Sequence, residues 1–111
     1  ETQGMIDKEV LDGLGPNGFV VNIARGSVID EATLLDALEA KSIAGAGLDV
    51  FLNEPNIDAR FLALDNVFLI PHQGSATVET RTGMAQTVKD NIDAFYSGTV
   101  PPTSITASRF S

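Results

Sequence analysis

The chain has 111 residues, a hydrophobic content of 43% and a net charge of −8. This acidity argues against electrostatic binding to nucleic acid or to an anionic membrane surface, and no apolar run approaches the roughly 20 residues that span a bilayer. The absence of cysteine excludes disulfides and thiolate metal sites, and it suits the reducing cytoplasm in which we expect the protein to reside. The lone histidine, without suitably spaced carboxylates, also argues against a metal site.

Segments typical of helices and strands alternate along the first part of the chain. Residues 7–14 predict a short helix that ends at Gly15-Pro16. Residues 19–23 are apolar and β-branched, which predicts a strand buried on both faces. Asp30 has the character of a helix N-cap, and the helix that it starts is expected to reach about Ala40, with these leucines on one face: Leu34, Leu35 and Leu38.

Two further strands and a long helix are predicted in the second part. Residues 43–48 predict a buried strand whose small residues allow a neighbour to approach closely, and residues 67–70 predict a third strand, stopped by Pro71. Residues 77–97 predict a helix that ends at Gly98, with an extended tail beyond it. Its apolar residues at helical spacing are expected to belong to a core: Met84, Val88, Ile92 and Phe95.

Strands separated by helices predict an α/β fold with a parallel sheet, because a parallel connection needs a dozen or more residues. In open sheets of this kind, ligands bind beyond the carboxyl ends of the strands. Each predicted strand is followed closely by a polar residue, namely Arg25, Asp49 and His72 in turn. Glu54 lies five residues after Asp49 and can reach the same edge from its loop. We therefore expect these four side chains to gather at one edge of the sheet.

A cluster of arginine, glutamate and histidine suits the interconversion of a 2-oxo acid and a 2-hydroxy acid. A guanidinium binds a carboxylate through two parallel hydrogen bonds. An imidazole gives a proton to a carbonyl oxygen or takes it back, and a neighbouring carboxylate orients the ring and favours its charged form. A serine hydrolase fits less well, because the chain has no Gly-x-Ser-x-Gly turn.

Each of these polar residues also has an ordinary structural interpretation when it is taken alone. Arg25 could be a surface salt-bridge partner, and Asp49 could cap the turn that follows it. Glu54 could be a solvated loop carboxylate. His72 is less easily explained in this way, since strand ends in such sheets often carry the chemistry. The functional interpretation therefore depends on finding all four residues together, each at its expected place after a strand.

Three segments resemble signatures of the D-isomer-specific 2-hydroxyacid dehydrogenases: residues 22–30, residues 45–51 with Glu54-Pro55, and residues 71–77. Residues 75–81 are most similar to the glyoxylate/hydroxypyruvate reductase branch of that family. The resemblance covers nearly the whole chain, from its start to about Pro102, in order and with similar spacing. Three motifs in register make the resemblance far more specific than any one of them would.

The resemblance implies a role for each matched residue. Arg25 would bind the carboxylate and carbonyl oxygen of a small 2-oxo acid, His72 would be the acid/base, and Glu54 would be its partner. The cofactor would be NAD or NADP, with Asp49 at its nicotinamide end. The residues expected to contact the cofactor are Ile23, Ala24, Arg25, Asp49, His72, Gly74 and Ser75. Gln73 departs from the aliphatic residue more usual in the motif and lies outside the matched catalytic positions.

The resemblance also implies a domain organisation. Residues 1–75 would form the carboxy-terminal half of a Rossmann-like, doubly wound NAD(P)-binding domain, and residues 76–111 a helix and tail that return toward a substrate domain. The Gly-x-Gly-x-x-Gly phosphate-binding turn of such domains is missing, and residues 45–47 are a poor substitute because they lie inside a predicted strand. We therefore expect a fragment that by itself neither holds a dinucleotide tightly nor turns over. The parent enzyme is expected to be a homodimer through its nucleotide-binding domain.

Two alternatives remain open at this point. The chain could come from another member of the same family, such as a phosphoglycerate, formate or phosphite dehydrogenase. It could also come from a dinucleotide-sensing binding protein of the corepressor type, which shares the fold and can keep the arginine, glutamate and histidine. Assays of the whole protein with 2-oxo acids distinguish a reductase from such a sensor.

Overall fold

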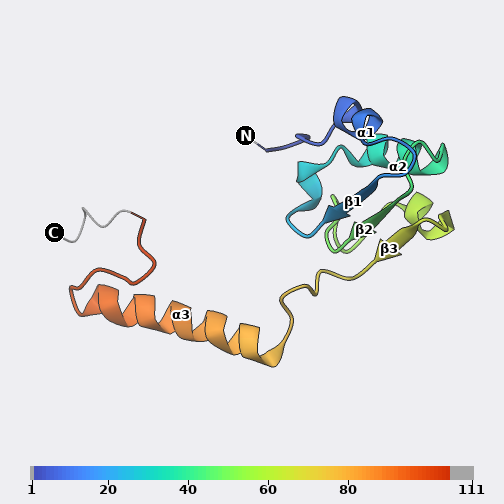
Figure 1. The fold of residues 1–111 in the computed structure, drawn as a ribbon. Coiled ribbons are helices and arrows are strands. Elements are labelled where there is room, and N and C mark those ends of the chain that lie inside the picture. Colours follow the sequence, from blue (N-terminus) through green and yellow to red (C-terminus); the bar gives the residue numbers. More distant parts are fainter. Residues whose placement is uncertain (1, 106–111) are drawn as a thin grey trace. The chain divides into compact units, whose positions relative to one another are not determined.

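The computed structural model describes residues 2–105. The chain divides between Gly74 and Ser75 into two compact units (Figure 1). The first unit contains the β-sheet and two short α-helices, and the second contains one long helix. Each unit has its own packing.

The helices and strands predicted for the first unit are all present, with small shifts at their ends. The strands β1 and β3 each end one residue earlier than predicted, and β2 begins two residues later. The bounds in chain order are α1 Lys8–Leu14, β1 Phe19–Asn22, α2 Glu31–Glu39, β2 Gly45–Leu48 and β3 Val67–Leu69. Two short 3-10 helices, η1 Gly26–Val28 and η2 Ala59–Ala63, were not predicted, because a single turn is too short to show an apolar period.

The three strands form one parallel sheet in the order β1-β2-β3, which confirms the predicted α/β fold (Figure 1). Asn22 at the end of β1 pairs with Leu48 at the end of β2, and Leu48 pairs with Leu69 at the end of β3. The predicted close approach at β2 is also confirmed, since a Cβ atom on Gly45 would lie 2.5 Å from the carbonyl oxygen of Asn66. The three strands therefore end together at one edge of the sheet.

A single hydrophobic core holds the first unit together. Leu11 of α1, Leu38 of α2 and Leu48 of β2 all belong to one buried cluster. The predicted N-cap of α2 is confirmed, because the Asp30 carboxylate accepts a hydrogen bond from the backbone N–H of Thr33 at 3.1 Å. This cap fixes the start of α2, the helix that packs on the core side of the sheet.

The prediction that β1 is buried on both faces is wrong for this structure. Phe19 and Val21 are 69% and 73% exposed, and Phe68 of β3 is 70% exposed. Successive strand residues point to opposite faces, and among residues 2–74 the α-helices cover only one of them. The apolar character of β1 therefore describes a sheet with one covered and one open face.

The second unit is built on α3, which spans Val78–Tyr96. Thr77 caps its start by accepting a hydrogen bond from the N–H of Thr80 at 3.1 Å, and Gly98, with φ of 72°, confirms the predicted end. None of the helices in the described part of the chain has both the length and the apolar character needed to cross a membrane. Of the predicted tail, residues 106–111 lie outside the described residues.

The prediction that the apolar stripe of α3 belongs to a core is wrong for the described residues. Its four members are 50–59% exposed, namely Met84, Val88, Ile92 and Phe95. Residues 75–105 contain no second helix or strand against which the stripe could pack. Apolar periodicity therefore identified the helix correctly but not the burial of its face.

Candidate functional site at the carboxyl edge

Polar residues follow all three strands at the edge where the strands end. We call this region the carboxyl edge and define it as residues 22–26, 49–54 and 70–74. Because the strands are parallel and paired in register, the segments that bear Arg25, Asp49 and His72 leave the sheet at the same edge. This is the arrangement that the sequence predicted.

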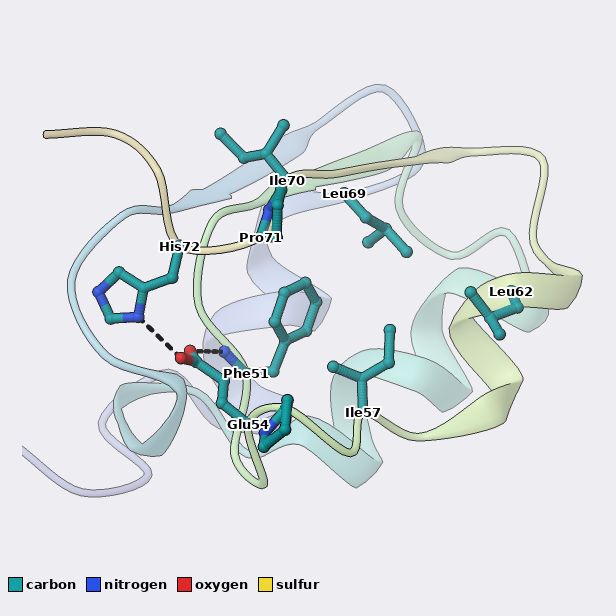
Figure 2. Close-up of a pocket in the computed structure, with 9 residues that line it drawn as sticks. Phe51, Glu54, Ile57, Leu62, Leu69, Ile70, Pro71 and His72 are labelled. Atoms are coloured by element: carbon teal, nitrogen blue, oxygen red, sulfur yellow. Dashed lines mark hydrogen bonds and ion pairs between the residues drawn. The ribbon is translucent and has the colours of Figure 1, made fainter. Parts of the chain in front are cut away.

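Glu54 and His72 form a hydrogen-bonded pair at this edge (Figure 2). The Nδ1 atom of His72 lies 2.8 Å from Oε2 of Glu54, while Oε1 of Glu54 accepts a hydrogen bond from the backbone N–H of Phe51 at 2.9 Å. The hydrogen bond with His72, and then that from Phe51, lower the pKa of the Glu54 carboxyl below its ordinary value. Glu54 is therefore an ionised acceptor at neutral pH, which assigns the proton at this contact to Nδ1 of His72.

The backbone of His72 is left-handed, with φ of 52°. This conformation is uncommon for a residue other than glycine and costs on the order of 1 kcal/mol. It is held by hydrogen bonds on both sides, because the N–H of His72 donates to the Ile70 carbonyl at 3.1 Å and the N–H of Gln73 donates to Asp49 at 2.6 Å. The surrounding structure thus determines how His72 projects from the edge.

Asp49 is buried at the centre of the carboxyl edge, with 3% of its surface exposed. Its two carboxylate oxygens accept hydrogen bonds from the N–H groups of Gln73 at 2.6 Å and Gly74 at 2.8 Å. A Cβ atom on Gly74 would lie 2.8 Å from Asp49 Oδ2, so a side chain there would crowd the carboxylate. Asp49 therefore anchors the segment that follows His72, an interaction that spacing alone did not reveal.

Arg25 lies on an exposed turn after β1, and its Nη1 donates a hydrogen bond to the Ala24 carbonyl at 2.6 Å. Within the described residues, its guanidinium forms no hydrogen bond with Glu54 or His72. Most of its five N–H donors thus remain for an anionic ligand. The structure places Arg25 at the predicted edge and brings Glu54 and His72 into direct contact.

The turn that carries Arg25 packs against the segment that carries Glu54. A Cβ atom on Gly26 would lie 2.1 Å from the backbone carbonyl carbon of Phe51, so only glycine allows this approach. Phe51 in turn donates its N–H to Glu54. The backbone beside the arginine is therefore fixed against the backbone that orients the carboxylate of the pair.

An apolar pocket of about 320 Å³ lies beside the Glu54–His72 pair. Figure 2 shows the residues that line it. The side chains of Phe51, Ile57 and Leu69 face it from the loop after β2 and from β3. The complete lining is Phe51, Glu54, Pro55, Ile57, Leu62, Leu69, Ile70, Pro71 and His72. The pair thus borders both solvent and an apolar surface.

The carboxyl edge also has features that suit a planar cofactor ring. The Ile23 side chain is 73% exposed directly after β1 and offers an apolar platform. Ala24 is exposed beside it, and Gly74 presents backbone without a side chain. Ser75, the remaining predicted contact, begins the second unit. A nicotinamide needs an apolar surface with polar groups at its border, and residues of the first unit supply both.

Comparison with known proteins gives a consistent family signal. Residues 1–74 match the family model described as "D-isomer specific 2-hydroxyacid dehydrogenase, NAD binding domain". The chain is 64% identical over 92 residues to 2-ketogluconate reductase of Gluconobacter oxydans, a match that covers 83% of this chain and 30% of that protein. It is 50% identical over 103 residues to glyoxylate reductase of Pyrococcus furiosus, covering 93% of this chain and 31% of that protein.

A solved structure also resembles the chain. It is an NADPH-dependent glyoxylate/hydroxypyruvate reductase from Sinorhizobium meliloti in complex with NADP and malonate, with a TM-score of 0.84 and 49% sequence identity. The match covers 86% of this chain and 30% of that one. The chain therefore spans about 30% of the length of the relatives that it matches.

Proposed function

Because the chain belongs to the D-isomer-specific 2-hydroxyacid dehydrogenases, we propose that it is part of an NAD(P)-dependent reductase of small 2-oxo acids. The product would be a D-2-hydroxy acid. The observation that carries this proposal is the 2.8 Å contact between Glu54 and His72 at the carboxyl edge, with Arg25 leaving the sheet at the same edge. A bound nicotinamide would supply the hydride.

His72 is the proposed acid/base. Its Nδ1 is bound to the ionised carboxylate of Glu54, so Nε2 is the nitrogen that exchanges a proton with the substrate. In the reductive direction, the N–H bond at Nε2 breaks as a new O–H bond forms on the substrate's carbonyl oxygen. Glu54 stabilises the charged imidazole that gives up this proton and fixes the orientation of the ring.

Arg25 is the proposed substrate clamp. Its guanidinium can bind the substrate's carboxylate through two parallel hydrogen bonds, which also orient the adjacent carbonyl group. Asp49, the backbone of Ile23 and Ala24, and the stretch Gly74-Ser75 are the proposed contacts of the nicotinamide end of the cofactor. The exposed Ile23 side chain and the Gly74 backbone beside Asp49 support this assignment.

The proposal extends to the organisation of the parent protein. We propose that residues 1–75 form the second half of an NAD(P)-binding domain and that residues 76–111 connect it to a substrate domain. The boundary between the compact units at Gly74 and the family match over residues 1–74 support the first part. A homodimer in the cytoplasm, with either NAD or NADP as cofactor, completes the proposal by resemblance to the family.

The complete protein that carries this chain should oxidise NADH or NADPH in the presence of at least one 2-oxo acid. Glyoxylate, hydroxypyruvate, pyruvate and 2-ketogluconate are the substrates to compare, and the loss of NADH or NADPH absorbance is the measurement. A folded protein that binds a dinucleotide without turning over any of these acids would contradict the proposal. That result would favour the dinucleotide-sensing alternative.

A further inference from the structure

Asn22 is a polar residue in a position where the fold would ordinarily place an apolar one. It is the last residue of β1, pairs with Leu48 of β2, and has only 5% of its surface exposed. Burying an amide is unfavourable unless its polar atoms find partners. The hydrogen bonds of Asn22 therefore indicate what it does.

Both polar atoms of the Asn22 side chain bind the backbone of the turn that carries Arg25. Its Nδ2 donates to the carbonyl oxygen of Arg25 at 3.0 Å, and its Oδ1 accepts from the N–H of Ala24 at 3.1 Å. The backbone carbonyl of Asn22 also accepts a hydrogen bond from the N–H of Asp49 at 3.0 Å. One buried residue thus fixes the turn to the end of the sheet.

The contacts require a donor and an acceptor on a side chain of this length. Aspartate would lose the donor and place an oxygen against the Arg25 carbonyl, while an aliphatic residue would satisfy neither backbone group. Glutamine has the same groups but is longer by a methylene, and the cavity that borders Asn22 and Gly26 has a volume of only about 10 Å³. Asparagine is the residue that fits both the chemistry and the space.

We propose that Asn22 is a positioning residue for Arg25, an inference that rests on the proposed function. Arg25 is exposed, so its long side chain loses conformational freedom when it binds a carboxylate in the two-bond geometry. Asn22 holds the backbone from which this side chain projects, and Gly26 packs on Phe51 on the other side of the same residue. The backbone that carries the guanidinium is therefore held in place, which improves binding and orientation of the 2-oxo acid.

The first test is Asn22→Ala in the complete protein, with glyoxylate as substrate and oxalate as an unreactive competitor. We expect KM for glyoxylate and the inhibition constant of oxalate to rise about tenfold, which corresponds to a loss of about 1.4 kcal/mol in binding free energy. KM for the nicotinamide cofactor should rise by a smaller factor, because Ala24, which the same side chain holds, is only one of several proposed cofactor contacts. An equal rise in both KM values would overturn the proposal, because it would mean that the whole edge is disturbed.

The second test asks whether Asn22 acts through Arg25. In an Arg25→Lys background the two-bond geometry is already lost, so Asn22→Ala should lower kcat/KM for glyoxylate by less than about threefold. Equal losses in the wild-type and Arg25→Lys backgrounds would overturn the proposal. If Asn22→Ala does not fold, Asn22→Asp replaces it, since it keeps the shape and the acceptor but lacks the donor to Arg25; unchanged oxalate binding there would also overturn the proposal.

Asn66 provides a matched control at the opposite end of the sheet. It directly precedes β3, and its side-chain amide donates to the Leu38 carbonyl at 3.1 Å, far in the fold from the turn of Arg25. Asn66→Ala should lower the melting temperature without changing oxalate binding. A wild-type protein that reduces no 2-oxo acid would instead contradict the proposed function, so the two failures can be told apart.

Discussion

The two units of the chain differ in how far they bury the same kind of apolar residue. Ile43, next to β2 in the first unit, is fully buried, whereas Ile92 on α3 is 50% exposed. In the first unit, helices cover one face of a sheet and enclose a core, while among residues 75–105 α3 has no partner element. Apolar spacing specifies which face of an element can be buried, and a second layer decides whether it is buried.

The units also differ in their polar residues. The first gathers Arg25, Asp49, Glu54 and His72 at one edge, where backbone N–H groups bind the carboxylates of Asp49 and Glu54. Most polar contacts of α3 join residues one turn apart, either between two side chains, as for Lys89 with Asp93 and Gln86 with Asp90, or between a side chain and the backbone, as for Thr87 with Gly83. Contacts of that kind support a helix without arranging groups for chemistry. We therefore expect substitutions in the first unit to have the larger effects.

The largest contrast is expected for turnover. His72→Ala should lower kcat for reduction of a 2-oxo acid by the complete protein by on the order of 10²–10⁴-fold, the usual scale for an acid/base group. Gln86→Ala on α3 is the control, and we expect its kcat to remain near that of the wild type. Steady-state kinetics at neutral pH measure both. A His72→Ala protein with near wild-type kcat would remove His72 from the proposed role.

The next contrast concerns stability and uses one residue type in both units. Ile43→Ala should lower the free energy of unfolding by about 2–5 kcal/mol, because it leaves a cavity in the core. Ile92→Ala should change it by less than about 1 kcal/mol, since the side chain is already half exposed and alanine favours a helix. Urea unfolding of the two variants of the 111-residue chain gives both values.

Equal losses in the free energy of unfolding for the two isoleucine variants would contradict the proposed difference between the units. They would show that the stripe of α3 is buried in solution, for instance by self-association of the chain. Repeating the unfolding at several protein concentrations would identify that case, because association makes the apparent stability depend on concentration.

The smallest effect is expected at the exposed Glu54–His72 pair. The pKa of Glu54 is lowered from its ordinary 4.5, first by the hydrogen bond with His72 and then by that from Phe51. Its ionised form therefore stabilises the fold above the unfolded-state pKa, and this contribution is lost as the pH falls through the lowered value. The difference in free energy of unfolding between wild type and Glu54→Gln should therefore shrink as the pH falls below the ordinary pKa of 4.5.

Glu9→Gln on α1 controls for the loss of one negative charge in this measurement. Urea unfolding at a series of pH values compares the three proteins. A difference between wild type and Glu54→Gln that stays constant down to the acid limit would contradict the assigned hydrogen bonds. Because the pair is exposed, high salt should reduce the effect further.

Much of the first unit could be predicted from local sequence patterns. Apolar runs located the strands, Asp30 and Gly15 marked helix ends, and the alternation of elements gave the parallel sheet. The polar residues after each strand followed from that topology, because parallel strands end at the same edge. These features depend on residues that are close in the sequence, so a single amino-acid sequence is enough to predict them.

Other features depend on contacts between distant segments, which local patterns do not record. The close approach of Gly26 to Phe51 and the two bonds from Asp49 to the residues after His72 are of this kind. Asn22 gave a visible signal, since a polar residue closed an otherwise apolar strand, but only its hydrogen bonds explain it. The open face of the sheet could not be predicted, because apolar composition is the same whether or not a second layer is present.

The left-handed backbone at His72 limits how this site could be redesigned. A library of replacements at position 72 should be rich in glycine, asparagine and aspartate, which accept φ near the observed 52°. Valine, isoleucine and threonine should be rare among folded members, because β-branched side chains are strongly disfavoured in that conformation. New chemistry at this position is therefore most accessible through side chains that are unbranched at Cβ, and β-branched ones would first require a different path for the main chain.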